Sequence, residues 1–151
     1  MRTSESGINF IASKERCSLS AYRNEGETYY TIGYGHYSKS VKPTDKITKD
    51  RALELFMGDL VTREDFINRM KLKDLTQNKF DALVSFIYNR GEGNFKKTKL
   101  YKHLMQGNYA KAAQDFLDPE NWNFTKFSEN MRKGLYSRRK QEQNIFVHGD
   151  Y

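Results

Sequence analysis

Apolar residues recur at helical spacing in the first segment of the chain, where Ile8, Ile11 and Ala12 lie three and four residues apart. This periodicity predicts a helix over residues 6–16. Glu15 continues the same row, four residues after Ile11. Glutamate is almost never fully buried without a partner. Glu15 is therefore either an ordinary exposed acid at a helix end or a carboxylate that the fold holds in a site.

The pattern changes over residues 19–38, which are rich in tyrosine and threonine and contain the turn residues Asn24, Glu25 and Gly26. Such a stretch predicts a β-hairpin followed by a third strand. No other part of the chain has a comparable strand pattern, so the sheet is expected to be small. Residues 43–45, Pro-Thr-Asp, predict a loop after it.

Helical spacing returns after this loop. Thr48 is expected to cap a long amphipathic helix whose inward row is Leu53, Phe56, Leu60 and Ile67. The segment after Thr76 is apolar on nearly every side from Phe80 to Tyr88, and Gly91 and Gly93 follow it. It predicts a helix capped by Thr76, buried in the middle of a lobe and ended by these glycines.

Three more helices are expected. One carries Leu100 and Leu104 and stops at Gly107, one covers residues 109–117, and the last covers residues 128–146 with Met131, Leu135 and Phe146 inward. Residues 118–121 break the chain before Trp122. The expected fold class is α+β, mostly helical, with one small antiparallel sheet on one side.

The length of 151 residues suits one compact domain, which buries about two thirds of the surface of the unfolded chain. The single cysteine, Cys17, excludes an internal disulfide and suits reducing conditions. No apolar run is long enough to span a membrane, and no hydrophobic signal-peptide core follows residues 1–5. The chain is therefore expected to be made and kept in a cytoplasm until it is released.

The net charge of +7 favours an anionic partner, either nucleic acid or the bacterial envelope. The chain shows no zinc-ligand spacing, no RNA-recognition signature and no phosphate-binding loop. Its basic residues are dispersed, as in residues 96–99 and 138–140, so most of them are expected to form a solvated surface. Nucleic acid is not favoured as a partner.

Three motifs together carry a family resemblance. Residues 21–36, with Thr-Ile-Gly-Tyr-Gly-His at 31–36, follow a helix that ends in Glu15, and they resemble the phage-type lysozymes of glycoside hydrolase family 24. Residues 76–91 are similar to that family's central buried helix, and residues 134–146 to its C-terminal Gly-Leu-x-x-Arg-Arg helix. The motifs occur in the family's order and span nearly the whole chain.

The resemblance implies a single domain over residues 1–151 with a two-lobed lysozyme-like fold. A small β-containing lobe would cover about residues 18–47. A larger helical lobe would comprise residues 1–17 and 70–151, and a long helix would join the two. The implied activity is hydrolysis of the β-1,4 bond between N-acetylmuramic acid and N-acetylglucosamine in peptidoglycan, with no metal and no cofactor.

Glycoside hydrolysis needs a carboxylic acid that protonates the leaving oxygen and a second carboxylate that activates water or attacks directly. By resemblance, Glu15 is the acid. Its place on an apolar stripe would raise its pKa, as a proton donor requires. Thr31 would hold the attacking water. The family inverts configuration, and that outcome is only an expectation for this chain.

The second carboxylate departs from the family pattern of Glu, eight residues, Asp, five residues, Thr. Counting forward from Glu15 gives Asn24, and counting back from Thr31 gives Glu25, so the hairpin is one residue longer than usual. Glu27 is a third candidate if the strand pairing shifts. We predict Glu25, because its spacing to Thr31 is kept. The plain alternative is that both glutamates are exposed turn acids.

The resemblance also implies supporting residues. An arginine of the last helix, Arg138 or Arg139, would pair with Glu15 while the other faces water, and His36 would be a structural hydrogen-bonding residue at the hinge. The residues expected to bind the sugars are Tyr30, Tyr34 and Asn89, with Phe95 or Trp122 as further candidates for the cleft.

Two rival functions stay open at the level of the sequence. One is a lysozyme-like protein that has lost its second acid and only grips glycan, and the other is a cationic membrane-disrupting protein that uses the last helix. A chitinase-like preference is a weaker third. The expected context is phage lysis by a monomer without stable membrane insertion, which passes from the host cytoplasm to the wall or periplasm through a separate holin-like protein.

Overall fold

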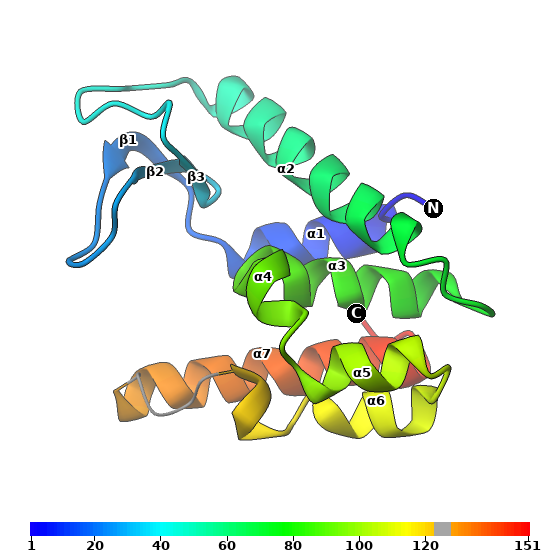
Figure 1. The fold of residues 1–151 in the computed structure, drawn as a ribbon. Helices are drawn as coiled ribbons and strands as arrows, with labels where there is room; N and C mark the ends of the chain where they lie inside the picture. Colours follow the sequence, from blue (N-terminus) through cyan, green and yellow to red (C-terminus); the bar gives the residue numbers. More distant parts are fainter. Residues whose placement is uncertain (123–127) are drawn as a thin grey trace.

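The computed structural model of the chain describes residues 1–122 and 128–151. It is mostly helical, with one small antiparallel sheet to one side (Figure 1), so the expected fold class is confirmed. In chain order the elements are α1 (Glu5–Lys14), β1 (Ser18–Tyr22), β2 (Tyr30–Gly33), β3 (His36–Ser38), α2 (Lys49–Arg69), α3 (Gln77–Arg90), α4 (Glu92–Phe95), α5 (Lys99–Met105), α6 (Tyr109–Asp115), the 3-10 helix η1 (Pro119–Trp122) and α7 (Glu129–His148).

Helix α1 ends two residues earlier than its periodicity predicts. Its N-terminus is capped by Ser4, whose Oγ accepts a hydrogen bond from the Gly7 backbone N–H at 3.1 Å. Glu15 is the C-terminal cap and has an extended backbone. The chain therefore leaves the helix at Glu15 and runs into the sheet, which places this carboxylate where the helices meet the sheet.

The sheet has the order β1-β2-β3, and both pairs are antiparallel, as the hairpin and third strand predicted. Strand β1 pairs with β2 through Ser18 opposite Gly33 and Tyr22 opposite Thr31, and the register shifts between these two pairs. A register shift inside a strand pair changes which side chains of β1 lie opposite those of β2. On the other side of β2, Thr31 pairs directly with Tyr37 of β3.

Helix α2 runs from the sheet to the helical part of the molecule (Figure 1). As predicted, Thr48 caps it, and the Thr48 hydroxyl accepts a hydrogen bond from the Arg51 N–H at 3.2 Å. The predicted inward position of Leu53 is wrong, because this side chain is 41% exposed. The buried row instead continues from Phe56 back to Ala52, which packs closely beneath Gly33 of β2.

Helix α3 lies at the centre of the helical part, packed against α1, α2 and α7 (Figure 1). Every residue from Phe80 to Ile87 is buried, as the uniformly apolar pattern predicted. Gly91, with φ +78°, ends the helix. Gly93 does not, because it lies within the short helix α4. Phe95 of α4 is fully buried in the core, so its expected place in a cleft is wrong.

Helix α7 packs against α3 through its C-terminal part, and Phe146 is buried as predicted. Met131 was expected to point inward, but it is 58% exposed. In Figure 1 the first turns of α7 extend past the end of α3. In the parts of the chain that the structure describes, no helix combines the length and apolar character needed to cross a membrane.

Candidate active site

A cleft of about 630 Å³ separates the β-hairpin from the ends of α1 and α3. Its lining combines carboxylates, hydroxyls, two amides and aromatic rings: Glu15, Tyr22, Asn24, Gly26, Glu27, Thr28, Thr31, Gly35, Tyr37, Tyr88 and Asn89. Such a lining suits a polar ligand that also has flat apolar faces, as sugars do.

Glu15 is held at the inner wall of this cleft with its side chain 18% exposed. Its Oε1 accepts a hydrogen bond from Arg138 Nη1 at 2.8 Å. Its other oxygen, Oε2, lies where the backbone of Gly35 comes close, because a Cβ at Gly35 would stand 3.4 Å from it. Gly35 also has φ +81°. Both features favour glycine at this position of the turn between β2 and β3.

Arg138 is itself fixed by several partners. Its Nε donates to Glu142 Oε1 at 3.1 Å, and its Nη2 donates to the backbone carbonyl of Ser85 at 3.3 Å. The Ser85 hydroxyl donates to the same Glu142 oxygen at 2.7 Å. Arg138 and Glu142 are both buried. The guanidinium therefore has a defined direction before any ligand arrives.

Arg139 is fully buried and lies over the ring of Phe86, 4.5 Å from its centroid. It pairs with Glu142 at 3.0 Å and donates to Asn89 Oδ1 at 2.8 Å. Burial lowers the pKa of Arg139 to about 10, so it remains cationic at neutral pH. The expectation that one of the two arginines faces water is therefore wrong, because Glu142 binds both of them.

Glu142 was not singled out as a site residue from the sequence. It lies three residues after Arg139 and four after Arg138, the spacing at which residues are neighbours on one helix face. That spacing was the available signal, since a buried arginine pair requires a carboxylate partner.

The hairpin presents Glu27 to the cleft, and Glu25 is not part of the lining. The Asn24 backbone N–H and Nδ2 donate to Glu27 at 3.0 and 3.3 Å, and the Glu27 N–H donates to the Asn24 carbonyl at 3.2 Å. The turn thus folds the Glu27 side chain back toward Asn24. Glu25 occupies the exposed corner of the same turn, so the expected placement of Glu25 in the cleft is corrected.

Thr31 is buried at the cleft wall, and two tyrosines of the sheet lie beside it. Tyr37 is its direct partner across the strands, and Tyr22 is its partner on the other side. Burial raises the pKa of the Tyr22 hydroxyl, and the charges of Glu27 and Glu15 raise it further. Tyr22 and both carboxylates line the same cleft.

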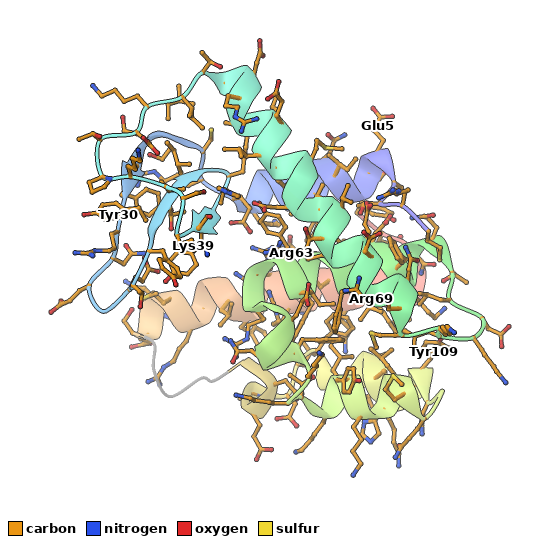
Figure 2. All side chains as sticks on the ribbon, turned by 45° about the horizontal axis from the view of Figure 1, so that its top comes forward. Glu5, Tyr30, Lys39, Arg63, Arg69 and Tyr109 are labelled. Carbon is orange, nitrogen blue, oxygen red and sulfur yellow. The ribbon has the colours of Figure 1, made fainter. Side chains whose placement is uncertain are left out.

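The two tyrosines expected to bind sugars do not line the cleft. Tyr30, labelled on the sheet in Figure 2, carries the Arg23 guanidinium over its ring at 4.9 Å. Tyr34 packs on Phe56, with the ring centroids 5.3 Å apart. Successive strand residues face opposite sides of a sheet, so Tyr30 faces away from Thr31. Tyr37 lies directly opposite Thr31 and lines the cleft with it, although the sequence interpretation did not name Tyr37 as a site residue.

The remaining predicted residues are placed as follows. Asn89 lines the cleft. His36 Nδ1 lies 2.9 Å from Asp59 Oδ2, so this histidine joins β3 to α2 and is paired away from Glu15. The side chain of Trp122 lies outside the described residues. Within residues 1–122 and 128–151, no group of three or more His, Cys, Asp or Glu side chains is arranged to hold a metal ion.

Comparisons with known proteins identify relatives of this chain. A family model described as phage lysozyme matches residues 12–142. The endolysin of Bacillus phage B103 is 41% identical over 99% of this chain, and the chain spans 56% of the length of that relative.

Among solved structures, the muramidase domain of SpmX from Asticaccaulis excentricus has a TM-score of 0.80 and is 30% identical, with 97% of each chain covered. The endolysin from Escherichia coli O157:H7 phage FAHEc1 has a TM-score of 0.78 and is 29% identical, covering 100% of this chain and 96% of its own.

Proposed function

Because the chain belongs to the phage lysozyme family, we propose that it hydrolyses the β-1,4 bond between N-acetylmuramic acid and N-acetylglucosamine in peptidoglycan. The observation that carries this proposal is the position of Glu15. Glu15 and Glu27 line the same cleft and so supply the two carboxyl groups that glycoside hydrolysis requires, and Arg138 orients the first of them.

In this proposal Glu15 protonates the leaving glycosidic oxygen. Arg138 positions the Glu15 carboxyl group and stabilises its negative charge once the proton has been transferred. Arg138 acts through Glu15, so it is a positioning residue. Glu142 and Ser85 in turn position Arg138, because both accept hydrogen bonds from its guanidinium group.

Glu27 and Thr31 are proposed to hold and activate the water. The Thr31 hydroxyl both donates and accepts hydrogen bonds, so it can orient a water molecule next to a carboxylate base. Glu27 replaces Glu25 in this role, because only Glu27 lines the cleft. Tyr22, Tyr37 and Tyr88 offer flat apolar surfaces for the sugar rings, and Asn89 offers an amide for their polar groups.

The rival functions find less support. A glycan-binding protein without a second acid was suggested by Asn24, but Glu27 now supplies a carboxylate in the cleft. A membrane-disrupting helix would need its cations on an exposed face. Two of the basic residues of α7, Arg138 and Arg139, are instead buried and paired.

The cell wall is the proposed place of action, in keeping with relatives named endolysins. A monomeric state, synthesis in the host cytoplasm and access through a separate holin-like protein stay predictions.

The replacement E15Q tests the proposed reaction. Glutamine keeps the size of the side chain but cannot supply the proton, so the rate of release of reducing ends from purified peptidoglycan should fall by about 10²–10⁴-fold. The control is E5Q, which changes an exposed glutamate in the first turn of the same helix. Activity of E15Q within a few-fold of the parent would remove Glu15 from the chemistry.

A further inference from the structure

The turn between β2 and β3 is bound to the end of α3 by one side chain. The Tyr88 hydroxyl of α3 donates a hydrogen bond to the backbone carbonyl of Tyr34 at 2.6 Å. Tyr88 and Gly35, the residue that follows Tyr34, both line the cleft. This hydrogen bond therefore joins the helical part of the molecule to the sheet at the wall of the proposed active site.

The ring that carries this hydroxyl is held by two side chains of α2. The Phe56 ring packs edge-to-face with the Tyr88 ring, with the centroids 5.5 Å apart, and it also contacts the Tyr34 ring. The Arg63 guanidinium lies over the Tyr88 ring, 5.4 Å from its centroid. Burial raises the pKa of the Tyr88 hydroxyl, and nearby carboxylates raise it further, so the hydroxyl keeps its proton and remains a donor. Its position is thus set by α2 and α3 together.

The position of the turn bears on the proposed proton donor. A Cβ at Gly35 would stand 3.4 Å from Glu15 Oε2, while Arg138 binds the other oxygen, Oε1, at 2.8 Å. The Glu15 carboxyl group therefore lies between a fixed guanidinium and the backbone of a fixed turn. If the turn moved away, Oε2 would lose this neighbour, and the carboxyl group would be free to rotate and to bind water there.

We infer that Tyr88 is a positioning residue for Glu15, because its hydroxyl holds the β2–β3 turn against the carboxyl group that transfers the proton. This inference rests on the proposed function and deepens it. The hydroxyl acts through the turn, whereas the Tyr88 ring contributes separately as a surface for sugar. Loss of the hydroxyl alone should therefore slow the chemical step and leave substrate binding unchanged.

The test compares two variants of the full chain, each of which loses one tyrosine hydroxyl. Y88F keeps the ring and loses the bond to Tyr34. Y109F is the matched control, because the Tyr109 hydroxyl also donates to a backbone carbonyl, that of Lys73, in the helical part away from the sheet (Figure 2). Release of reducing ends from soluble peptidoglycan strands gives kcat and KM. Thermal unfolding reports on the fold, and amide hydrogen exchange of residues 34–36 reports on the turn.

Y88F should have a kcat about fivefold below that of the parent, the fold-change that corresponds to one hydrogen bond, with KM unchanged. Amide exchange in the turn should be faster. Y109F should keep the parent's kcat, KM and exchange in the turn, although both variants should unfold at a slightly lower temperature than the parent. In an E15Q background, Y88F should slow the residual reaction no further, because Tyr88 acts through the carboxyl group that has been removed.

The inference is overturned if Y88F keeps the parent's kcat, and a raised KM would then mean that the hydroxyl binds sugar directly. It is also overturned if Y109F loses as much kcat as Y88F, or if Y88F slows E15Q by the same factor as it slows the parent. A parent that releases no reducing ends refutes the proposed function itself.

Discussion

Arg138 binds two carboxylates at once. Its Nη1 donates to Glu15 and its Nε to Glu142, which also receives the Ser85 hydroxyl. Burying any one of these charged groups alone would cost free energy, and the hydrogen bonds and ion pairs within the cluster offset that cost. The proposed proton donor is thus oriented by a residue that is itself immobilised, which is how a site reaches its working geometry before substrate binds.

Glu27 and Glu25 form a matched pair for testing the second carboxylate. Loss of the base should reduce hydrolysis by E27Q about 10²–10⁴-fold. E25Q changes the exposed corner of the same turn and should stay within a few-fold of the parent. Rates on purified peptidoglycan measure both effects. If E27Q keeps the parent's rate and E25Q loses activity, Glu25 is the base, as its spacing to Thr31 predicted. If only N24A loses activity, the side-chain amide of Asn24 holds the water.

The individual elements show what spacing along the chain can and cannot predict. The burial of α3 from Phe80 to Ile87 could be predicted because a helix that is covered on every side has an apolar residue at nearly every position. The exposure of Leu53 could not be predicted, because it depends on Gly33 of the sheet, which packs over Ala52 of α2. That contact joins segments that share no local pattern.

The hairpin shows the same limit at the site. Candidates for the second acid were found by counting from Glu15 and from Thr31, and counting assumes regular pairing. The strands instead shift register between Ser18 and Tyr22. The tight turn from Asn24 to Glu27 then selects which acid faces inward. Glu15 could be predicted only from its spacing together with the family resemblance, because in the structure it is the extended C-terminal cap of α1 and lies outside the helical row.

Helix α7 offers a test of the buried ion pairs. E142Q removes the charge shared by Arg138 and Arg139, so the free energy of unfolding should fall by about 3–5 kcal/mol. E129Q, on the same helix, breaks an exposed pair with Lys133 and should change stability by less than about 1 kcal/mol. Denaturant unfolding measures both. Equal effects would mean that the buried pairs contribute no more than surface ones.

At the scale of the whole molecule, both ends of the chain are bound to the helical part, away from the sheet (Figure 1). Arg2 and Thr3 donate hydrogen bonds to Glu64 of α2. Ser4 and Tyr151 donate hydrogen bonds to Asp81 of α3, so one side chain of α3 binds segments from both ends of the chain.

Glu64 should make stability depend on acid pH. Burial raises its pKa, but hydrogen bonds from Arg2 and Thr3 outweigh this and leave the pKa below the ordinary value of 4.5. The stabilisation is therefore complete above pH 4.5 and is lost as the pH falls toward the lowered pKa. E64Q should be less stable by about 1–3 kcal/mol at pH 7, with a smaller difference at pH 3.

The free energy of unfolding of the parent and E64Q at pH 3, 5 and 7 measures this dependence. D65N, at the exposed neighbouring position, should track the parent at every pH. A difference between E64Q and the parent that does not change with pH would contradict the assignment.

Under the proposed function, the net charge of +7 should make hydrolysis of the cell wall depend on salt. Screening at high ionic strength weakens attraction to an anionic wall, so raising salt from about 0.05 to 0.5 M should slow the reaction on the order of tenfold. A short neutral oligosaccharide should be cleaved at nearly the same rate in both. If salt slows cleavage of both substrates equally, the effect arises in the cleft and not from attraction of the protein to the anionic wall.

Glu15 and Arg138 are 123 positions apart, so the acid and the residue that orients it leave the ribosome at very different times. A nascent chain displays Glu15, Glu27 and Thr31 long before α7 exists. Hydrolytic competence is therefore expected only after α7 has been synthesised. Translation products that stop before α7 would carry the proposed reacting groups without the arginine that orients Glu15.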